Sequence, residues 1–162
     1  MADRTALLTA GERAWLDRLI LPLPRGATIL DLGCGGGEPI DRYLIDHGFH
    51  IVGVDSGATA IELARTRFPR ERWLLGDMRQ VALDETFAGV VGWNSLHLLS
   101  SADHDLMAGR IMAWLEPGGR LLFSGVAADH GAALTRRGMV EMAHIEHDAS
   151  CDGANVSLMR KP

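Results

Sequence analysis

The chain has 162 residues, of which 47% are hydrophobic and 23% charged, a composition typical of one globular domain. Its formal net charge of −5 excludes a broad basic surface for nucleic acid or anionic lipid. The two cysteines, Cys34 and Cys151, are too few for a disulfide framework or a thiolate metal site. The sequence has neither a signal-peptide pattern at its beginning nor an apolar run of membrane-spanning length, so we expect a cytoplasmic protein.

Predicted helices and strands alternate along most of the chain. A capping box at Thr9 opens the first helix, which ends near Leu21 because prolines follow it. Next come, in chain order, strand 27–32, helix 39–47, strand 49–54, helix 58–68, strand 72–75, strand 87–93, a helix 101–115 capped by Ser101, and strand 120–125. Strands that alternate with helices imply right-handed crossovers and an α/β, doubly wound, mostly parallel sheet of Rossmann-like form.

The end of the chain breaks this alternation. Residues 139–148 and 155–160 are predicted as two strands joined by a polar loop, an antiparallel hairpin that brings the expected sheet to seven strands. Residues 126–138, which precede this hairpin, leave room for a short helix at most. We therefore expect one sheet face near strand 120–125 to be thinly covered, so that a second copy of the chain can bury it.

Three of the predicted strands end in an acidic residue. Asp31 precedes a glycine-rich loop at 33–37, and Asp55 and Asp77 follow the next two strands. One glycine loop alone is weak support, but three such strand ends in order indicate a nucleoside cofactor at the carboxyl edge of a parallel sheet. A nicotinamide fingerprint would need glycine or alanine where Glu38 stands, and the loop has no lysine at phosphate-loop spacing.

With these motifs the sequence resembles the class I S-adenosylmethionine-dependent methyltransferases over essentially its whole length. The matching segments are 30–37 (Leu-Asp-Leu-Gly-Cys-Gly-Gly-Gly), 52–55 (Val-Gly-Val-Asp), 76–78 (Gly-Asp-Met) and 115–122 (Leu-Glu-Pro-Gly-Gly-Arg-Leu-Leu). The resemblance is strongest to bacterial small-molecule methyltransferases, from which this chain departs by its shortened acceptor region. It implies a single domain, 1–162, with an N-terminal helical extension (1–25), a cofactor-binding core (26–125), and a shortened connection with the terminal hairpin (126–162).

The resemblance also implies which residues bind S-adenosyl-L-methionine. They are Asp31, Gly33, Cys34, Gly35, Gly37, Asp55, Ser56, Asp77, Met78, Trp93 and Asn94. In this family the first acid holds the cofactor's ammonium group, the second accepts from both ribose hydroxyls, and the third accepts from the adenine amino group. The glycines let the main chain approach the cofactor where a Cβ would collide.

His97 is the candidate general base, because an imidazole titrates near neutral pH. The alternative interpretation is a histidine at a helix start that bonds the backbone. The segment around it lacks the Asn/Asp-Pro-Pro-aromatic pattern of amino-directed nucleic-acid methyltransferases, so we expect a small-molecule acceptor and no nucleic acid. We expect no metal, because His144 and His147 would point to opposite faces of their strand.

The sequence thus predicts an S-adenosylmethionine-dependent methyltransferase that acts on an oxygen, nitrogen or carbon of a small molecule and leaves S-adenosyl-L-homocysteine. The alternative is a cofactor-binding protein of the same fold without methyl transfer, acting as a regulator, a scaffold or a non-methylating catalyst. The pared-down acceptor region suggests that a homodimer or a partner protein completes the acceptor site.

Overall fold

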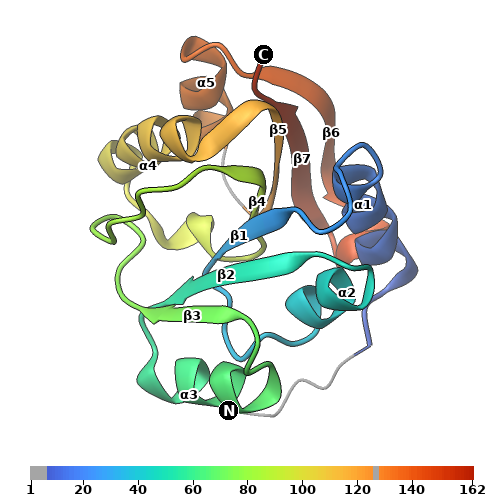
Figure 1. Cartoon of the computed structure of the whole chain (residues 1–162). Helices are drawn as coiled ribbons and strands as arrows, with labels where there is room; N and C mark the ends of the chain where they lie inside the picture. The colour runs from blue at the N-terminus through green and yellow to red at the C-terminus, as the bar shows by residue number, and fades with distance from the viewer. Residues whose placement is uncertain (1–6, 126–127) are drawn as a thin grey trace.

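The computed structural model of the protein describes residues 7–125 and 128–162. These residues form one seven-stranded sheet with helices on both faces (Figure 1). The strands are β1 (Thr28–Leu32), β2 (His50–Asp55), β3 (Arg72–Leu75), β4 (Phe87–Gly92), β5 (Leu115–Ser124), β6 (Val140–Asp148) and β7 (Ala154–Arg160). The helices are α1 (Ala10–Ile20), α2 (Ile40–Asp46), α3 (Ala58–Arg67), α4 (Ser101–Trp114) and α5 (Ala128–Arg136), with short 3-10 helices η1 (Leu96–Leu98) and η2 (Ala149–Cys151).

The strand order is β3-β2-β1-β4-β5-β7-β6. Strands β1 to β5 are parallel, whereas β7 pairs antiparallel with both β5 and β6. This arrangement confirms the predicted Rossmann-like sheet with an antiparallel terminal hairpin. After β1 the chain builds outward through β2 and β3, then returns to place β4 on the other side of β1. A crevice opens at the carboxyl ends of strands where the order reverses in this way.

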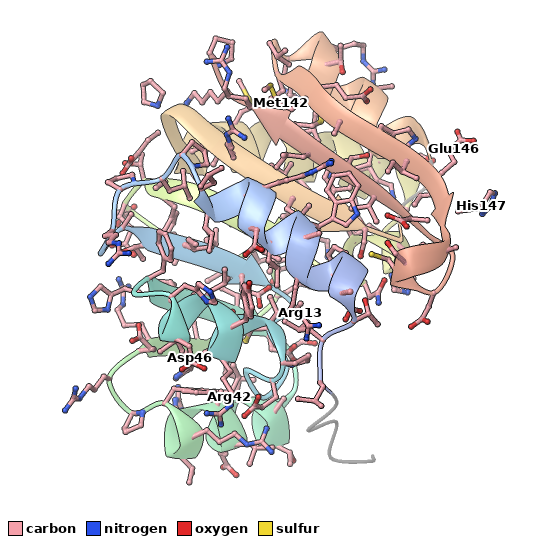
Figure 2. All side chains as sticks on the ribbon, turned by 90° about the vertical axis from the view of Figure 1, so that its right-hand side faces the viewer. Arg13, Arg42, Asp46, Met142, Glu146 and His147 are labelled. Carbon is pink, nitrogen blue, oxygen red and sulfur yellow. The ribbon has the colours of Figure 1, made fainter. Side chains whose placement is uncertain are left out.

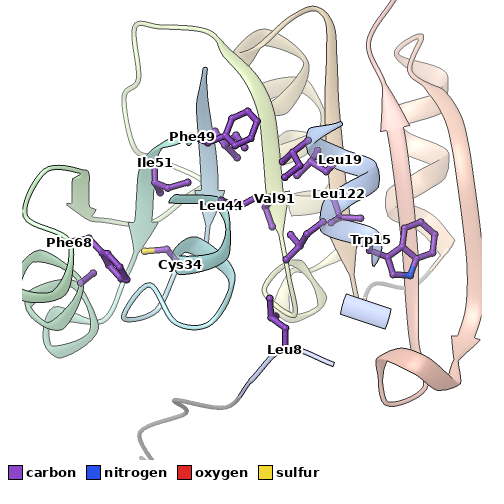
Figure 3. Close-up of a cluster of buried hydrophobic side chains, with 14 of the residues drawn as sticks. Leu8, Trp15, Leu19, Cys34, Leu44, Phe49, Ile51, Phe68, Val91 and Leu122 are labelled. Atoms are coloured by element: carbon purple, nitrogen blue, oxygen red, sulfur yellow. The ribbon is translucent and has the colours of Figure 1, made fainter. Parts of the chain in front are cut away.

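Two hydrophobic cores cover the two faces of the sheet. Figure 3 shows the first, in which Leu19 of α1 and Leu44 of α2 pack over Ile51 and Val91. The second lies under α4 and α5. Successive side chains of a strand alternate between faces, so Asp31 shares the α2 side with Ile29. The strand periodicity therefore carries one acidic side chain into the layer between β1 and α2.

Strand β5 begins earlier than the sequence pattern predicted. It starts at Leu115, directly after α4, and runs through the segment that was expected to be only a turn. Gly118 has a φ of +80°, and the main chain of Gly118 and Gly119 bonds the main chain of Lys161. Pairing with the end of the chain thus extends β5 across a Pro-Gly-Gly sequence. A shift in the β4–β5 register between Phe87 and Gly89 accommodates it.

Two further expectations were wrong. The cap of α4 is Ser100 rather than Ser101, since the Ser100 Oγ accepts from the Asp103 main-chain N at 3.2 Å. The sheet near β5 is also well covered: Leu121 and Leu122, which face opposite sides, are both fully buried. The connection forms the short helix α5, and this helix and α1 lie on opposite sides of β5 (Figure 1).

No helix within 7–125 and 128–162 combines the length and the apolar character that a membrane crossing requires.

Candidate functional site

A cavity of about 590 Å³ lies at the carboxyl ends of the central strands, where the strand order reverses. Its lining residues come from the ends of β1, β2, β3 and β4: Gly33, Gly35, Val54, Asp55, Ser56, Gly76, Asp77, Met78, Arg79, Asn94, Ser95 and Leu99. A cavity of this size and mixed polarity is typical of a small-molecule site. Most of the residues predicted to bind the cofactor therefore meet at one place.

Backbone conformation and crowding require the glycines of the loop after β1. Gly33 has a φ of +84°, and a Cβ there would lie 2.4 Å from the Cβ of Ser95. Ser95 is itself held by a 2.6 Å hydrogen bond from its Oγ to the carbonyl of Leu32. At Gly35, φ is +57° and nothing lies within 4 Å of a Cβ position. The main chain of this loop thus forms a wall of the cavity without side chains in the way.

Asp55 ties two loops of the cavity together. One carboxylate oxygen accepts from the Gly35 main-chain N at 2.9 Å, and the other accepts from the Gly57 main-chain N at 2.8 Å. Each carboxylate oxygen has a second lone pair, so both can still accept a hydrogen bond from a ligand hydroxyl. The same side chain therefore positions the glycine loop and presents acceptors to the cavity.

Asp77 carries an arginine partner that the sequence prediction missed. The Arg79 guanidinium bonds both Asp77 oxygens, at 2.6 to 3.1 Å, and reaches Asp103 at 3.0 Å. These bonds from Arg79 hold the pKa of Asp77 down at about 2. Arg79 lines the cavity and links the loop after β3 to the first turn of α4. The only signal in the sequence was an acid and a base two residues apart.

Three other predicted residues face away from this cavity. The Cys34 thiol is buried toward Gly53, on the Phe68 side of the core (Figure 3), and burial raises its pKa. A Cβ on Gly37 would lie 2.8 Å from the Phe68 ring, so this glycine serves core packing. Trp93 borders a separate cavity of about 110 Å³. None of the three is among the residues that line the larger cavity.

Asn94 lies between the two cavities and lines both. It has a φ of +52°, and the Oγ of Ser124 on β5 accepts from its main-chain N at 3.0 Å and donates to its Oδ1 at 3.2 Å. His97 is exposed on η1, outside the lining of the larger cavity. A Cβ on Gly125 would lie 3.0 Å from Asn94 Oδ1 and 3.6 Å from His97 Nδ1. Both side chains therefore border the end of β5.

Asp31 lies beneath the glycine loop rather than in its cavity, and it has an acidic partner. It is 4% exposed, and its carboxyl bonds the carboxyl of Asp41 on α2, which is fully buried. Burial raises the pKa of Asp31 to about 7, although the bond from Asp41 opposes this rise. Burial and the charge of Asp31 raise the pKa of Asp41 well above its ordinary value. Two carboxyls can share a hydrogen bond only if one of them holds a proton.

The two histidines of β6 lie in the terminal hairpin, away from the cavity described above. His144 Nδ1 and the Ser157 Oγ on β7 lie 2.7 Å apart, and His147 stands in a left-handed conformation with a φ of +51°. Within the described ranges, no group of three or more His, Cys, Asp and Glu side chains is arranged to hold a metal ion.

The larger cavity fits S-adenosylmethionine. The open space at the Cβ position of Gly35 allows close approach, and Asp55 presents acceptors suited to a ribose diol. Met78 and Leu99 add apolar lining for a base, and the acidic lining suits a ligand with a net positive charge. Asp55, Ser56, Asp77 and Met78 are the residues that would hold the nucleoside, with Asn94 beyond the glycine loop.

This fold and site define a class I S-adenosylmethionine-dependent methyltransferase, and the chain belongs to that family. Residues 29–119 match the family described as the methyltransferase domain. The chain is 33% identical over 129 residues to a trans-aconitate 2-methyltransferase of Azoarcus sp. (strain BH72), covering 74% of this chain and 48% of that protein. It is 35% identical over 108 residues to a 2-phytyl-1,4-naphtoquinone methyltransferase of Thermosynechococcus vestitus, covering 62% of this chain and 46% of that protein. The chain thus spans about half the length of these curated relatives.

Solved structures match over most of the chain. A TehB-like SAM-dependent methyltransferase from Corynebacterium glutamicum is 26% identical, with a TM-score of 0.77 over 91% of this chain and 88% of that one. The N-methyltransferase NodS from Bradyrhizobium japonicum, solved with S-adenosyl-L-homocysteine, has a TM-score of 0.79 over 95% and 89%. At 22% identity, the second likeness concerns the fold alone.

Proposed function

We propose that this protein transfers a methyl group from S-adenosylmethionine to an oxygen, nitrogen or carbon of a small molecule and leaves S-adenosylhomocysteine. The observation that carries the proposal is Asp55, which holds the glycine loop and presents acceptors to a cavity at the switch point of the sheet. Relatives named for trans-aconitate and for a naphthoquinone support a small-molecule acceptor.

The cofactor, when bound, supplies a methyl group on a positively charged sulfur. Transfer is an in-line displacement, so the protein acts by orienting the two reactants and excluding water. Asp55 and Ser56 fix the nucleoside, and the main chain at Gly35 fixes the neighbouring part. Asn94, held by Ser124, stands at the boundary where the acceptor has to approach.

We assign the acceptor to the cavity of about 110 Å³ that shares Asn94 with the cofactor cavity. Trp93 and Ile40 give this cavity apolar lining, and Glu12 and Asp152 give it carboxylates. Where the acceptor has to lose a proton, His97 is the proposed general base, because it borders the same end of β5 as Asn94.

Calorimetry with S-adenosylmethionine and S-adenosylhomocysteine tests the cofactor site. Asp55→Ala should weaken binding about a hundredfold, because two charge-assisted hydrogen bonds and the hold on the loop are lost. Ser157→Ala, on β7, is a control that should bind like the wild type. Failure of the wild type to bind either compound would sink the proposal.

A screen of a metabolite extract for incorporation of labelled methyl then tests transfer. Incorporation that falls more than tenfold in His97→Ala and persists in His47→Ala supports the base role. Turnover of His97→Ala within a few-fold of the wild type would remove that role. Tight cofactor binding without incorporation into any metabolite would favour the alternative, a binding protein of this fold.

We also propose that a second copy of the chain covers the edge strand β6 and helps to complete the acceptor side. Three apolar side chains of β6 are strongly exposed: Val140 at 43%, Met142 at 46% and Ile145 at 43%. Figure 2 shows Met142, Glu146 and His147 projecting outward from this strand. Sedimentation of the wild type should show a dimer and that of Met142→Lys a monomer; a wild type that stays monomeric at all concentrations would contradict this.

A cytoplasmic location is part of the same proposal. Both cysteines, Cys34 and Cys151, are buried free thiols, which suits a reducing compartment.

A further inference from the structure

A buried acid pair lies under the cofactor loop, and the mechanism above does not use its second member. Asp41 is fully buried on α2, and within the described residues neither of its oxygens meets an N–H or O–H donor. An unpartnered carboxylate at such a place would be strongly destabilising. Its carboxyl makes a side-chain contact with the carboxyl of Asp31, itself 4% exposed. The two carboxyls can form a hydrogen bond with each other only if one of them holds a proton.

The surroundings of the pair decide which carboxyl keeps this proton. The ionisable groups that act on the pair are Glu38 before α2, Asp55 at the end of β2, Glu71 before β3 and the Cys34 thiol. The three carboxylates disfavour a second negative charge. Asp41 is the more deeply buried of the two, and two of these carboxylates, Glu38 and Glu71, act on it. Asp41 is therefore the acid that stays protonated, and Asp31 is the acceptor next to the loop.

We propose that Asp41 is a positioning residue that donates its carboxylic proton to Asp31, holds Asp31 as the single anion below the cofactor loop, and couples cofactor binding to proton release. The inference rests on the proposed cofactor site and on the contact between Asp31 and the ammonium group of the cofactor that the family resemblance implies. The hydrogen bond from Asp41 stabilises the charged form of Asp31 and keeps it available near neutral pH.

The sign of the coupling follows from competition. A proton on Asp31 and a cationic ligand beside it exclude each other, so binding favours the ionised form. The association constant should therefore rise with pH until Asp31 is ionised in the free protein. Below that range it should fall by up to about tenfold per pH unit. Removing the donor at position 41 should move this range upward by about one pH unit or more.

Two substitutions at position 41 distinguish the effect of the hydrogen-bond donor from the effect of side-chain shape. Asp41→Asn keeps an N–H that can donate to Asp31, whereas Asp41→Leu has the same number of side-chain heavy atoms and no donor. Calorimetry with S-adenosylhomocysteine from about pH 6 to about 8.5 gives the association constant of each variant relative to the wild type. The ligand's own amino group titrates in this range but cancels in the ratio. The ratio for Asp41→Asn should stay near one, and that for Asp41→Leu should fall to about one tenth near pH 7 and recover as the pH rises.

A second measurement does not depend on how Asp41→Leu folds. Calorimetry near pH 7 in two buffers of different ionisation enthalpy counts the protons released on binding. The wild type should release a larger fraction of a proton than Asp31→Asn, in which position 31 has no proton to release. Equal release from the two proteins would overturn the inference, and so would a pH-independent ratio for Asp41→Leu. A wild type that fails to bind even at about pH 8.5 would instead overturn the proposed function, and this inference with it.

Discussion

A buried histidine pair between α4 and α5 should make the protein sensitive to acid. His104 and His130 face each other with their Nδ1 atoms 3.0 Å apart, so the pair shares one proton as donor and acceptor. His130 is fully buried, with the Phe123 ring 4.9 Å from its own. Burial, and then the neighbouring His104, lower the pKa of His130 to about 4 from its ordinary 6.5. His130 therefore takes up a proton in the folded protein only when the pH is low.

The size of the effect follows from that difference in pKa. In the unfolded chain His130 takes up a proton below about pH 6.5, whereas in the folded protein it does so only near pH 4. The unfolded state thus binds more protons between these values, and the free energy of unfolding falls as the pH drops through them. The slope is about 1.4 kcal/mol per pH unit, which gives a loss of about 3 kcal/mol at the acid end. Against a typical total of about 5–15 kcal/mol this is a large fraction.

Urea unfolding of the wild type and of His130→Asn, from about pH 7.5 to about pH 4, isolates this contribution. Asparagine keeps a polar partner for His104 but does not titrate, so the difference between the two free energies should change by about 3 kcal/mol across the range. His147→Asn, at an exposed histidine with a positive φ, is the matched control and should follow the wild type. If His130→Asn loses stability in acid as steeply as the wild type, the pair is not the cause.

Three further substitutions test the contacts that hold the site and its frame. Gly33→Ala should destabilise by about 2 kcal/mol in thermal unfolding, because φ is positive and Ser95 blocks the Cβ; an unchanged melting temperature would contradict the crowding. Thr9→Ala removes the capping box of α1 and should cost about 1 kcal/mol in urea unfolding. Thr66→Ala is the control, and an equal loss of stability in the two variants would contradict the role of the cap. Lys161→Met should cost about 1 kcal/mol, since its Nζ donates at 2.8 Å to two carbonyls at the end of α4, and wild-type stability would refute that role.

The cofactor half of the site was predictable because its signals are local. A strand that ends in an acid, followed by glycines, has few stable continuations other than a tight turn into a helix. Gly35 and Asp55 were found in this way, and the structure joins them by one hydrogen bond. The requirement at Gly33 also has a local part, its positive φ. Glycine is also required at position 33 because Ser95 lies close to it. That contact joins residues far apart in sequence, so it can be recognised only once the sheet is known.

The residues that were missed owe their roles to tertiary contacts. Asp41 shares the buried side of α2 with Leu44, and an acid on an apolar stripe was a visible but unused signal. Arg79 gains its role by reaching Asp103, which the parallel sheet and α4 bring close. The early start of β5 depends on pairing with Lys161 at the end of the chain. In each case the deciding partner lies on, or directly after, another helix or strand of the fold.

The proposed acceptor cavity is built by a contact between α1 and the terminal hairpin. Thr9 Oγ1 donates to the carbonyl of Ser150 at 2.8 Å, and Trp15 Nε1 donates to Asp148 at 2.9 Å. The approach is close enough that a Cβ on Gly11 would lie 2.1 Å from the Ser150 Oγ. Residues from both segments line this cavity, whereas none of them reaches the cofactor cavity. The two halves of the site therefore rest on different parts of the fold, so the acceptor can change while the glycine loop and Asp55 stay as they are.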